Sequence, residues 1–183
     1  MNTYAVLLRG INVGGKNKVP MAELKKCLEE EGYSNVATYI ASGNVILETK
    51  KSSSSIKEEI EKILPKRFKL HSELVKVLVL NRKQLQAIID SKPKSFGIHP
   101  DKYHSDVIFL IDVPAKQAMS VFNPKEGVDM VWPGKGVIYS QRLSALRTQS
   151  RLSKIVGTSA YKSMTIRNWN TTTKLLDLLR ERE

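Results

Sequence analysis

Several kinds of residue are scarce in this chain of 183 residues, and each scarcity excludes a class of protein. A single cysteine, Cys27, cannot form an internal disulfide framework or a zinc or iron–sulfur site built from cysteines. Aromatic residues make up 7% of the chain, and no strand carries the alternating aromatics of an RNA-recognition motif. No apolar run reaches the roughly 18 residues that a membrane span requires. We therefore expect a soluble protein of the reducing cytoplasm, without a secretory signal, membrane contact, metal or cofactor.

Acidic residues are scarce as well, since 30 Lys and Arg face 18 Asp and Glu and leave a net charge of +12. The deficit is concentrated, because no Asp or Glu occurs between Asp129 and Asp177. That stretch has a charge of +8, from Lys135, Arg142, Arg147, Arg151, Lys154, Lys162, Arg167 and Lys174. A field of this sign attracts phosphates, and each Arg offers them a planar fork of donors. The alternative is a solvated face that lacks acid by chance.

The residues that are present predict an α+β fold. In the first half, the hydrophobic pattern and a hairpin signal predict the order β-α-β-β-α-β, which is ferredoxin-like. Ser55 with Glu58 fits a capping box at the start of the second helix, and Pro65 ends or bends that helix. The strands are expected at residues 3–8, 36–40, 45–48 and 74–80.

The second half partly repeats this plan, so we expect two packed ferredoxin-like subdomains, residues 1–80 and 81–183. Asn81 and Gln84 can cap its first helix. A basic helical region is expected near residues 144–156, and the motif of residues 165–171 is expected to open the last helix. Between these the pattern predicts strands at residues 107–111, 128–132 and 137–140 and a short helix at 115–121.

The loop from Gly10 to Lys18 matches the pattern G-x-x-x-x-G-K after a predicted strand. A phosphate-hydrolysing P-loop is disfavoured, because Asn17 replaces the Ser or Thr that holds magnesium and Pro20 delays the helix. Two interpretations remain open. The loop binds a phosphate through backbone N–H groups and the start of the helix, or its glycines only provide a turn with positive φ.

Three further features offer candidate site residues. Arg167 near the start of the last helix opposes the helix dipole, which makes sense if an anion or a distant carboxylate lies beside it. Asn168, Asn170 or Thr171 can cap that helix. His99, Asp101 and His104 match no standard metal-ligand spacing. Trp132 could stack on a base or a sugar, or it could fill the gap between the two subdomains.

Four motifs together resemble the bacterial domain-of-unknown-function family 1697. They are Arg9-Gly-Ile-Asn-Val-Gly-Gly-Lys16-Asn-Lys18, Met21-Ala-Glu-Leu24, Tyr39-Ile-Ala-Ser-Gly-Asn-Val45 and Thr165-x-Arg167-Asn-Trp169-Asn-Thr171. The resemblance runs over essentially the whole chain and implies two ferredoxin-like subdomains. It implies no activity, substrate or catalytic residue.

The leading hypothesis is a basic protein that binds nucleic acid through residues 135–174, helped by the Arg9–Lys18 loop. A rival hypothesis is an enzyme or sensor for a small phosphorylated ligand, held by the Gly10–Lys18 loop and Arg167. A third is a protein-interaction module with apolar surface near Trp132 or near Val121 and Phe122. The anion-binding candidates are Arg9, Asn12, Gly14, Gly15, Lys16, Lys18, Arg142, Arg147, Arg151, Lys154, Arg167 and Asn168.

Overall fold

Two four-stranded antiparallel sheets, with helices packed on them, make up the computed structural model, which describes residues 1–71 and 75–182. The fold is therefore α+β, as the sequence predicted. The chain divides into two units, Met1–Leu85 with Leu175–Glu183 and Gln86–Lys174. It passes from one unit to the other inside two helices, α3 (Arg82–Asp90) and α5 (Trp169–Arg180). The sequence predicts a single boundary between subdomains, near residue 80.

Unit 1 has the order β-α-β-β-α-β that the sequence predicted, whereas its ferredoxin-like classification stays a prediction. Its sheet has the strand order β2-β3-β1-β4, and neighbouring strands run antiparallel. The start of the last strand was predicted at Leu74, which lies outside the described residues. The elements are β1 (Asn2–Arg9), α1 (Met21–Glu30), β2 (Ser34–Tyr39), β3 (Asn44–Thr49), α2 (Ser53–Phe68) and β4 (Lys76–Asn81).

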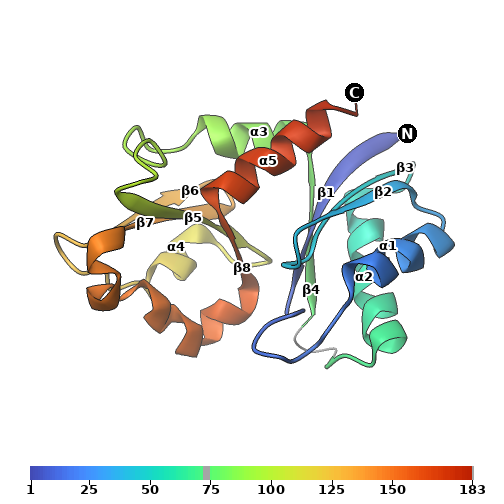
Figure 1. Cartoon of the computed structure of the whole chain (residues 1–183), viewed down its shortest axis with the longest axis horizontal. Coiled ribbons are helices and arrows are strands. Elements are labelled where there is room, and N and C mark those ends of the chain that lie inside the picture. The colour runs from blue at the N-terminus through green and yellow to red at the C-terminus, as the bar shows by residue number, and fades with distance from the viewer. Residues whose placement is uncertain (72–74, 183) are drawn as a thin grey trace. The chain divides into compact units, whose positions relative to one another are not determined.

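Helices α1 and α2 cover one face of this sheet (Figure 1). Alternate residues of a strand point to the same face, so Tyr4, Val6 and Leu8 of β1 enter one core. The helices meet them with residues at three- and four-residue spacing. The main helical contributions are Leu24, Leu28, Ile56, Ile60 and Leu64, which are fully buried.

Two details of α2 differ from the prediction. Ser52, not Ser55, caps the helix, because its Oγ accepts a hydrogen bond from the backbone N–H of Ser55 at 3.2 Å. Four consecutive serines offered several possible caps, and the pattern did not choose among them. Pro65 does not end the helix, which continues to Phe68 and closes at Lys69 in the left-handed region.

Unit 2 contains the second sheet, in which the strand order is β6-β7-β5-β8. Asn81 and Gln84 cap α3 as predicted, since each side-chain oxygen accepts the other residue's backbone N–H at 2.9 Å. The other elements are β5 (Tyr103–Leu110), α4 (Ala115–Met119), β6 (Asp129–Gly134), β7 (Val137–Leu143), η2 (Ser144–Gln149), η3 (Leu152–Gly157), η4 (Ser159–Ser163) and β8 (Met164–Asn168).

The chain after β7 differs most from the prediction. The expected basic helical region consists of three short 3-10 helices, η2 to η4. Strand β8 was not predicted at all, because residues 164–168 were assigned to the opening of the last helix. The reason is visible in its sequence. Thr165 and Arg167 alternate with Met164 and Ile166, but the strand is only five residues long and runs directly into α5, so the pattern does not separate it from the helix.

The two faces of the second sheet carry different residues. One face forms an apolar core with α4 and η3, centred on Ile108, Ile138 and Ile155. On the other face Phe96 packs edge-on against the rings of Trp132, Tyr139 and Trp169, with centroids 5.2–6.3 Å apart. Trp132 therefore belongs to an aromatic cluster within unit 2.

Candidate functional site

The loop between β1 and α1 is held in place by its own polar side chains. The Asn12 side-chain amide donates to the carbonyl oxygens of Val19 and Ala41, each at 2.9 Å, and its oxygen accepts the Val19 N–H at 2.7 Å. The Asn17 amide donates to the carbonyl oxygen of Gly10 at 2.8 Å. These amides close the loop, and Asn12 fastens it to the turn before β3.

Gly14 and Gly15 form the tip of this loop, between the bridged residues Val13 and Lys16. Their φ angles are +56° and +76°, a combination that suits a two-residue turn and favours glycine. Helix α1 begins only at Met21, and its cap, Pro20, makes no side-chain hydrogen bond. A P-loop would place the helix directly after Lys16, so this loop is not a phosphate-hydrolysing P-loop, as Asn17 and Pro20 indicated.

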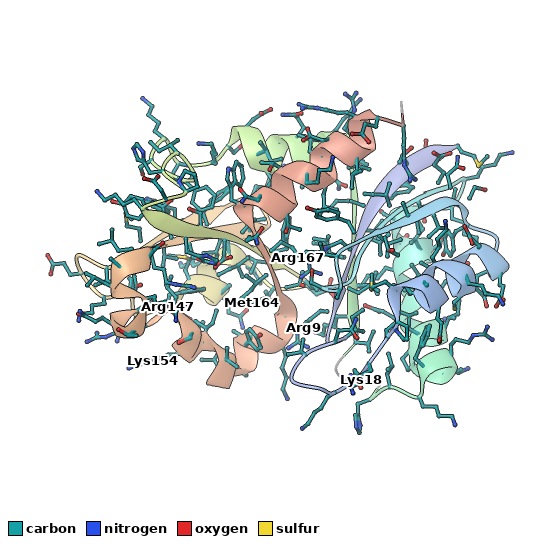
Figure 2. The ribbon with its side chains drawn as sticks, viewed as in Figure 1. Arg9, Lys18, Arg147, Lys154, Met164 and Arg167 are labelled. Atoms are coloured by element: carbon teal, nitrogen blue, oxygen red, sulfur yellow. The ribbon has the colours of Figure 1, made fainter. Side chains whose placement is uncertain are left out.

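Lys16 and Lys18 are exposed at the end of this loop, and Arg9 is half-buried at the end of β1 (Figure 2). The loop thus offers two solvent-facing cations. All three side chains belong to unit 1, whereas Arg167 belongs to unit 2.

The basic segment of residues 144–163, which we call the η segment, connects β7 to β8 in unit 2. Arg147 lies on η2 and Lys154 on η3 (Figure 2). Among the described residues, none of the basic side chains of the η segment forms an ion pair, and all are exposed. They are Arg147, Arg151, Lys154 and Lys162.

Asp129, the last acidic residue before the acid-free stretch, fixes the start of η3. Its Oδ2 accepts the backbone N–H of Arg151 at 2.8 Å and that of Lys125 at 2.9 Å. Burial alone would raise the pKa of this carboxyl. The effect of burial is outweighed by the two backbone hydrogen bonds, by a hydrogen bond from the Ser150 side chain and by the charge of the nearby Arg142. The pKa of Asp129 therefore lies below its ordinary value.

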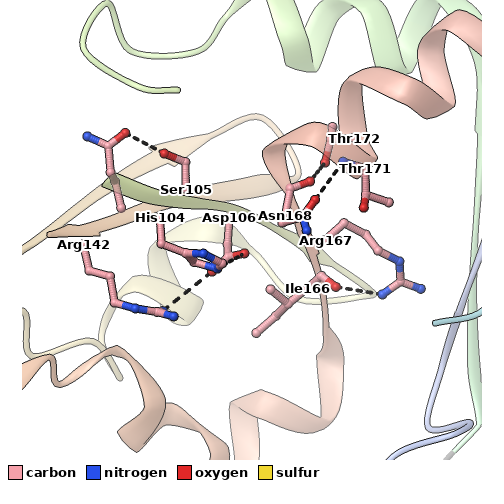
Figure 3. Close-up of polar contacts among 10 residues, drawn as sticks. His104, Ser105, Asp106, Arg142, Ile166, Arg167, Asn168, Thr171 and Thr172 are labelled. Carbon is pink, nitrogen blue, oxygen red and sulfur yellow. Dashed lines mark hydrogen bonds and ion pairs between the residues drawn. The ribbon is translucent and has the colours of Figure 1, made fainter. Parts of the chain in front are cut away.

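Arg142 differs from the exposed cations of the η segment, because it is half-buried on β7 and faces Asp106. The guanidinium lies 3.9 Å from one carboxylate oxygen of Asp106, and His104 Nε2 lies 3.1 Å from the other (Figure 3). Burial raises the pKa of Asp106 even though both partners favour its charge. His104 therefore pairs with Asp106 rather than with Asp101. Within the described residues, no three His, Cys, Asp or Glu side chains gather as a metal site would need.

Arg167 lies in strand β8, not at the start of a helix, and its side chain is 6% exposed. Its Nη1 donates to the Thr165 hydroxyl at 2.9 Å and to the Ile166 carbonyl oxygen at 2.8 Å. Burial lowers its pKa to about 10. The prediction that Arg167 opposes the dipole of the last helix is therefore wrong. Asn168 does cap α5, because its Oδ1 accepts the Thr171 N–H at 2.7 Å.

A small hollow of about 100 Å³, which we call the Asn170 pocket, lies in unit 2 beside the cap of α5. Its walls come from the loop at Gly97 and Pro100, from residues 103–105 of β5 and from residues 168–170. No sequence pattern brings these residues together, since only the strand pairing between β5 and β8 does so.

Comparison with known proteins agrees with the motifs. Residues 1–139 match the family described as protein of unknown function, DUF1697, and the chain therefore belongs to that family. The whole chain is similar to a solved structure described as that of the conserved bacterial protein SP0830 from Streptococcus pneumoniae. The two share 26% sequence identity with a TM-score of 0.78, and the match covers 97% of this chain and 98% of the other.

Neither comparison supplies an activity, and no curated protein matches the chain. Among residues 1–71 and 75–182, no helix is both long and apolar enough to cross a membrane.

Proposed function

We propose that this protein binds nucleic acid in the cytoplasm, and that the η segment is its main contact surface. The observation that carries the proposal is the set of four exposed cations on, or directly before, three consecutive short helices, in a stretch without any acid. Cations without ion-pair partners lose no existing interaction when they bind phosphate. Spread over residues 147–162, they suit a ligand with several phosphates better than one with a single phosphate.

Not every cation within residues 135–174 is assigned to the proposed contact surface, because some already have partners or are buried. Arg142 already faces Asp106, and Arg167 is buried, so neither is assigned a phosphate contact. The exposed Lys16 and Lys18 on the β1–α1 loop are assigned a secondary contribution. The affinity should come mainly from release of counterions and should therefore depend strongly on salt.

A fluorescence-anisotropy titration with labelled RNA and DNA, over about 50 to 300 mM salt, tests the proposal. Logarithmic affinity should fall linearly with logarithmic salt, by about 0.7–0.9 for each phosphate contacted. Replacing the four η-segment cations by Gln should remove about 3 from that slope. Absence of binding at about 50 mM salt would refute the proposal.

The matched control removes the same charge from unit 1. Lys25, Lys26, Lys62 and Lys66 are exposed on α1 and α2, and the first two form ion pairs with Glu29 and Glu30. Replacing these four by Gln should leave the slope nearly unchanged. An equal loss in both variants would mean that only net charge matters and that the η segment is not the contact surface.

A second candidate function, binding of a small phosphorylated ligand, is favoured by a different feature of unit 1. A hollow of about 560 Å³ is lined by Arg82, Lys83 and Arg182, and no Asp or Glu is part of its lining. Nucleotides or sugar phosphates would raise the melting temperature if they bind there, because they stabilise only the folded state. The double variant Lys83→Gln with Arg182→Gln should abolish that shift. No shift with any such ligand would exclude this candidate.

A further inference from the structure

The Asn170 pocket has no role in the contacts considered so far. It differs in chemistry from the η segment, because no Lys, Arg, Asp or Glu lines it. A phosphate group is usually bound by cations or by a row of backbone N–H groups. Apart from His104, whose ring pairs with Asp106, the polar side chains of the lining are uncharged, which suits a ligand that carries both donors and acceptors.

The polar groups around the pocket retain hydrogen-bonding capacity of both kinds. Among the described residues the Asn170 amide has no partner, and Asn168 uses only its Oδ1, so its Nδ2 remains available. The Ser105 hydroxyl donates to Gln141 Oε1 at 2.8 Å and can still accept. His104 uses one ring nitrogen for Asp106 and keeps the other. Donors and acceptors of this kind match the edge of a nucleobase.

The size and the wall of the pocket agree with a single aromatic ring. Benzene occupies an enclosed cavity of about 150 Å³ in a protein interior, so a hollow of about 100 Å³ receives a pyrimidine ring only in part, with the rest of the ring outside it. One wall is Trp169, whose ring packs edge-on against Phe96 at 5.2 Å. Gly97 lies against the indole so closely that a Cβ there would come within 2.7 Å of it.

The pocket also lies next to the origin of the η segment. Tyr103 and His104, which line it, pair with Leu143 and Arg142 at the end of β7. The backbone N–H of Ser144, the first residue of η2, donates to the carbonyl oxygen of Lys102 at 3.0 Å. The start of η2 and the pocket thus lie on the two sides of the same end of β5, one strand apart.

From this geometry we infer that the Asn170 pocket receives one unpaired pyrimidine base of a single-stranded nucleic acid. The inference rests on the proposed function, since the η segment supplies the phosphate contacts. The polar side chains that line the pocket then distinguish one base from another. Base contacts specify a sequence and phosphate contacts provide affinity, so this pocket is the part of unit 2 that would give selectivity.

Three labelled oligonucleotides of equal length and charge test the inference: oligothymidylate, oligodeoxyadenylate and an abasic strand. The wild type should bind oligothymidylate about tenfold more tightly than the abasic strand and more tightly than oligodeoxyadenylate, with equal salt slopes. Asn170→Ala and His104→Gln should reduce this preference to less than about twofold. The exposed Asn123→Ala, also in unit 2, is the matched control and should keep the preference.

The outcomes separate the two proposals. Equal affinity of the wild type for the abasic strand and oligothymidylate overturns the pocket inference and leaves the proposed function standing. Equal affinity for thymidylate and adenylate overturns the pyrimidine assignment. Absence of binding to every strand at low salt overturns the proposed function and the inference with it. Circular dichroism of each variant confirms that it is folded.

Discussion

The carboxylate of Asp129 accepts the backbone N–H of Arg151 at 2.8 Å, although the two residues are far apart in the sequence. The same oxygen accepts the N–H of Lys125. The last acidic residue before the acid-free stretch thus holds the basic stretch in position through its backbone, while the Arg151 side chain stays exposed. An anchor of this kind fixes the chain without neutralising its charge.

Asp129→Asn is expected to lower the free energy of unfolding by about 2 kcal/mol at neutral pH, because charge-assisted hydrogen bonds are lost. The pKa of Asp129 lies below its ordinary value in the folded state, so its contribution is present above the unfolded pKa and is lost as pH falls through the folded value. Urea titrations at pH 7 and near pH 3 should therefore show a smaller difference at the lower pH. Asp101→Asn, at an exposed position, should show no measurable difference at either pH.

Asn12→Ala is expected to lower the free energy of unfolding by about 2–3 kcal/mol. The side chain makes three hydrogen bonds to the backbone, and its φ of +54° is costly for alanine. Asn35→Ala, at φ +49° with a single side-chain hydrogen bond to Glu48, is the control and should cost clearly less. Equal urea midpoints for the two variants would contradict a structural role for Asn12.

Gly97→Ala should destabilise the protein more than Gly136→Ala does. Both glycines have positive φ, +75° and +73°, so both substitutions strain the backbone. Only at Gly97 would the added Cβ meet another group, the Trp169 ring at 2.7 Å, whereas nothing lies within 4 Å at Gly136. We expect about 1–3 kcal/mol of additional loss at Gly97, together with a changed tryptophan fluorescence spectrum. Equal losses at both sites would show that the loop does not contact Trp169 closely.

Arg167→Met should reduce stability without affecting nucleic-acid binding, whereas Arg147→Met should weaken binding without affecting stability. Arg167 is buried and donates to Thr165 and Ile166, so its loss should reduce the free energy of unfolding by about 2 kcal/mol. It should leave the salt slope of nucleic-acid binding unchanged. Arg147 is exposed, so its loss should leave stability unchanged and reduce the slope by about 0.7–0.9. A reduced slope in the Arg167 variant would assign that residue to the binding surface.

Much of the fold could be predicted because its elements follow local rules. Turn residues and hydrophobic spacing marked β1, α1 and the β2–β3 hairpin, and the reciprocal pair Asn81 and Gln84 marked the start of α3. Strand β8 could not be found in this way. A strand of five residues gains its stability from pairing with a neighbour that is distant in sequence, and so short an alternation beside a helix does not reveal that partner.

The candidate site shows the same division. The acid-free stretch is a property of composition, so the sequence alone predicted where cations gather. Which of these cations are exposed depends on their neighbours: Arg142 faces Asp106 because β7 pairs with β5, and Arg167 is buried because it lies in β8. The Asn170 pocket likewise exists only after residues from three separate segments have been brought together.

The short helices of the η segment also affect how fast its backbone amides exchange hydrogen with water. Short 3-10 helices have few and poorly aligned hydrogen bonds, so amides in residues 144–163 should exchange faster than those of the sheet beside them. A partner that orders this stretch would slow exchange where the free protein exchanges fastest. The proposed binding surface is thus also the region in which a bound state is easiest to detect.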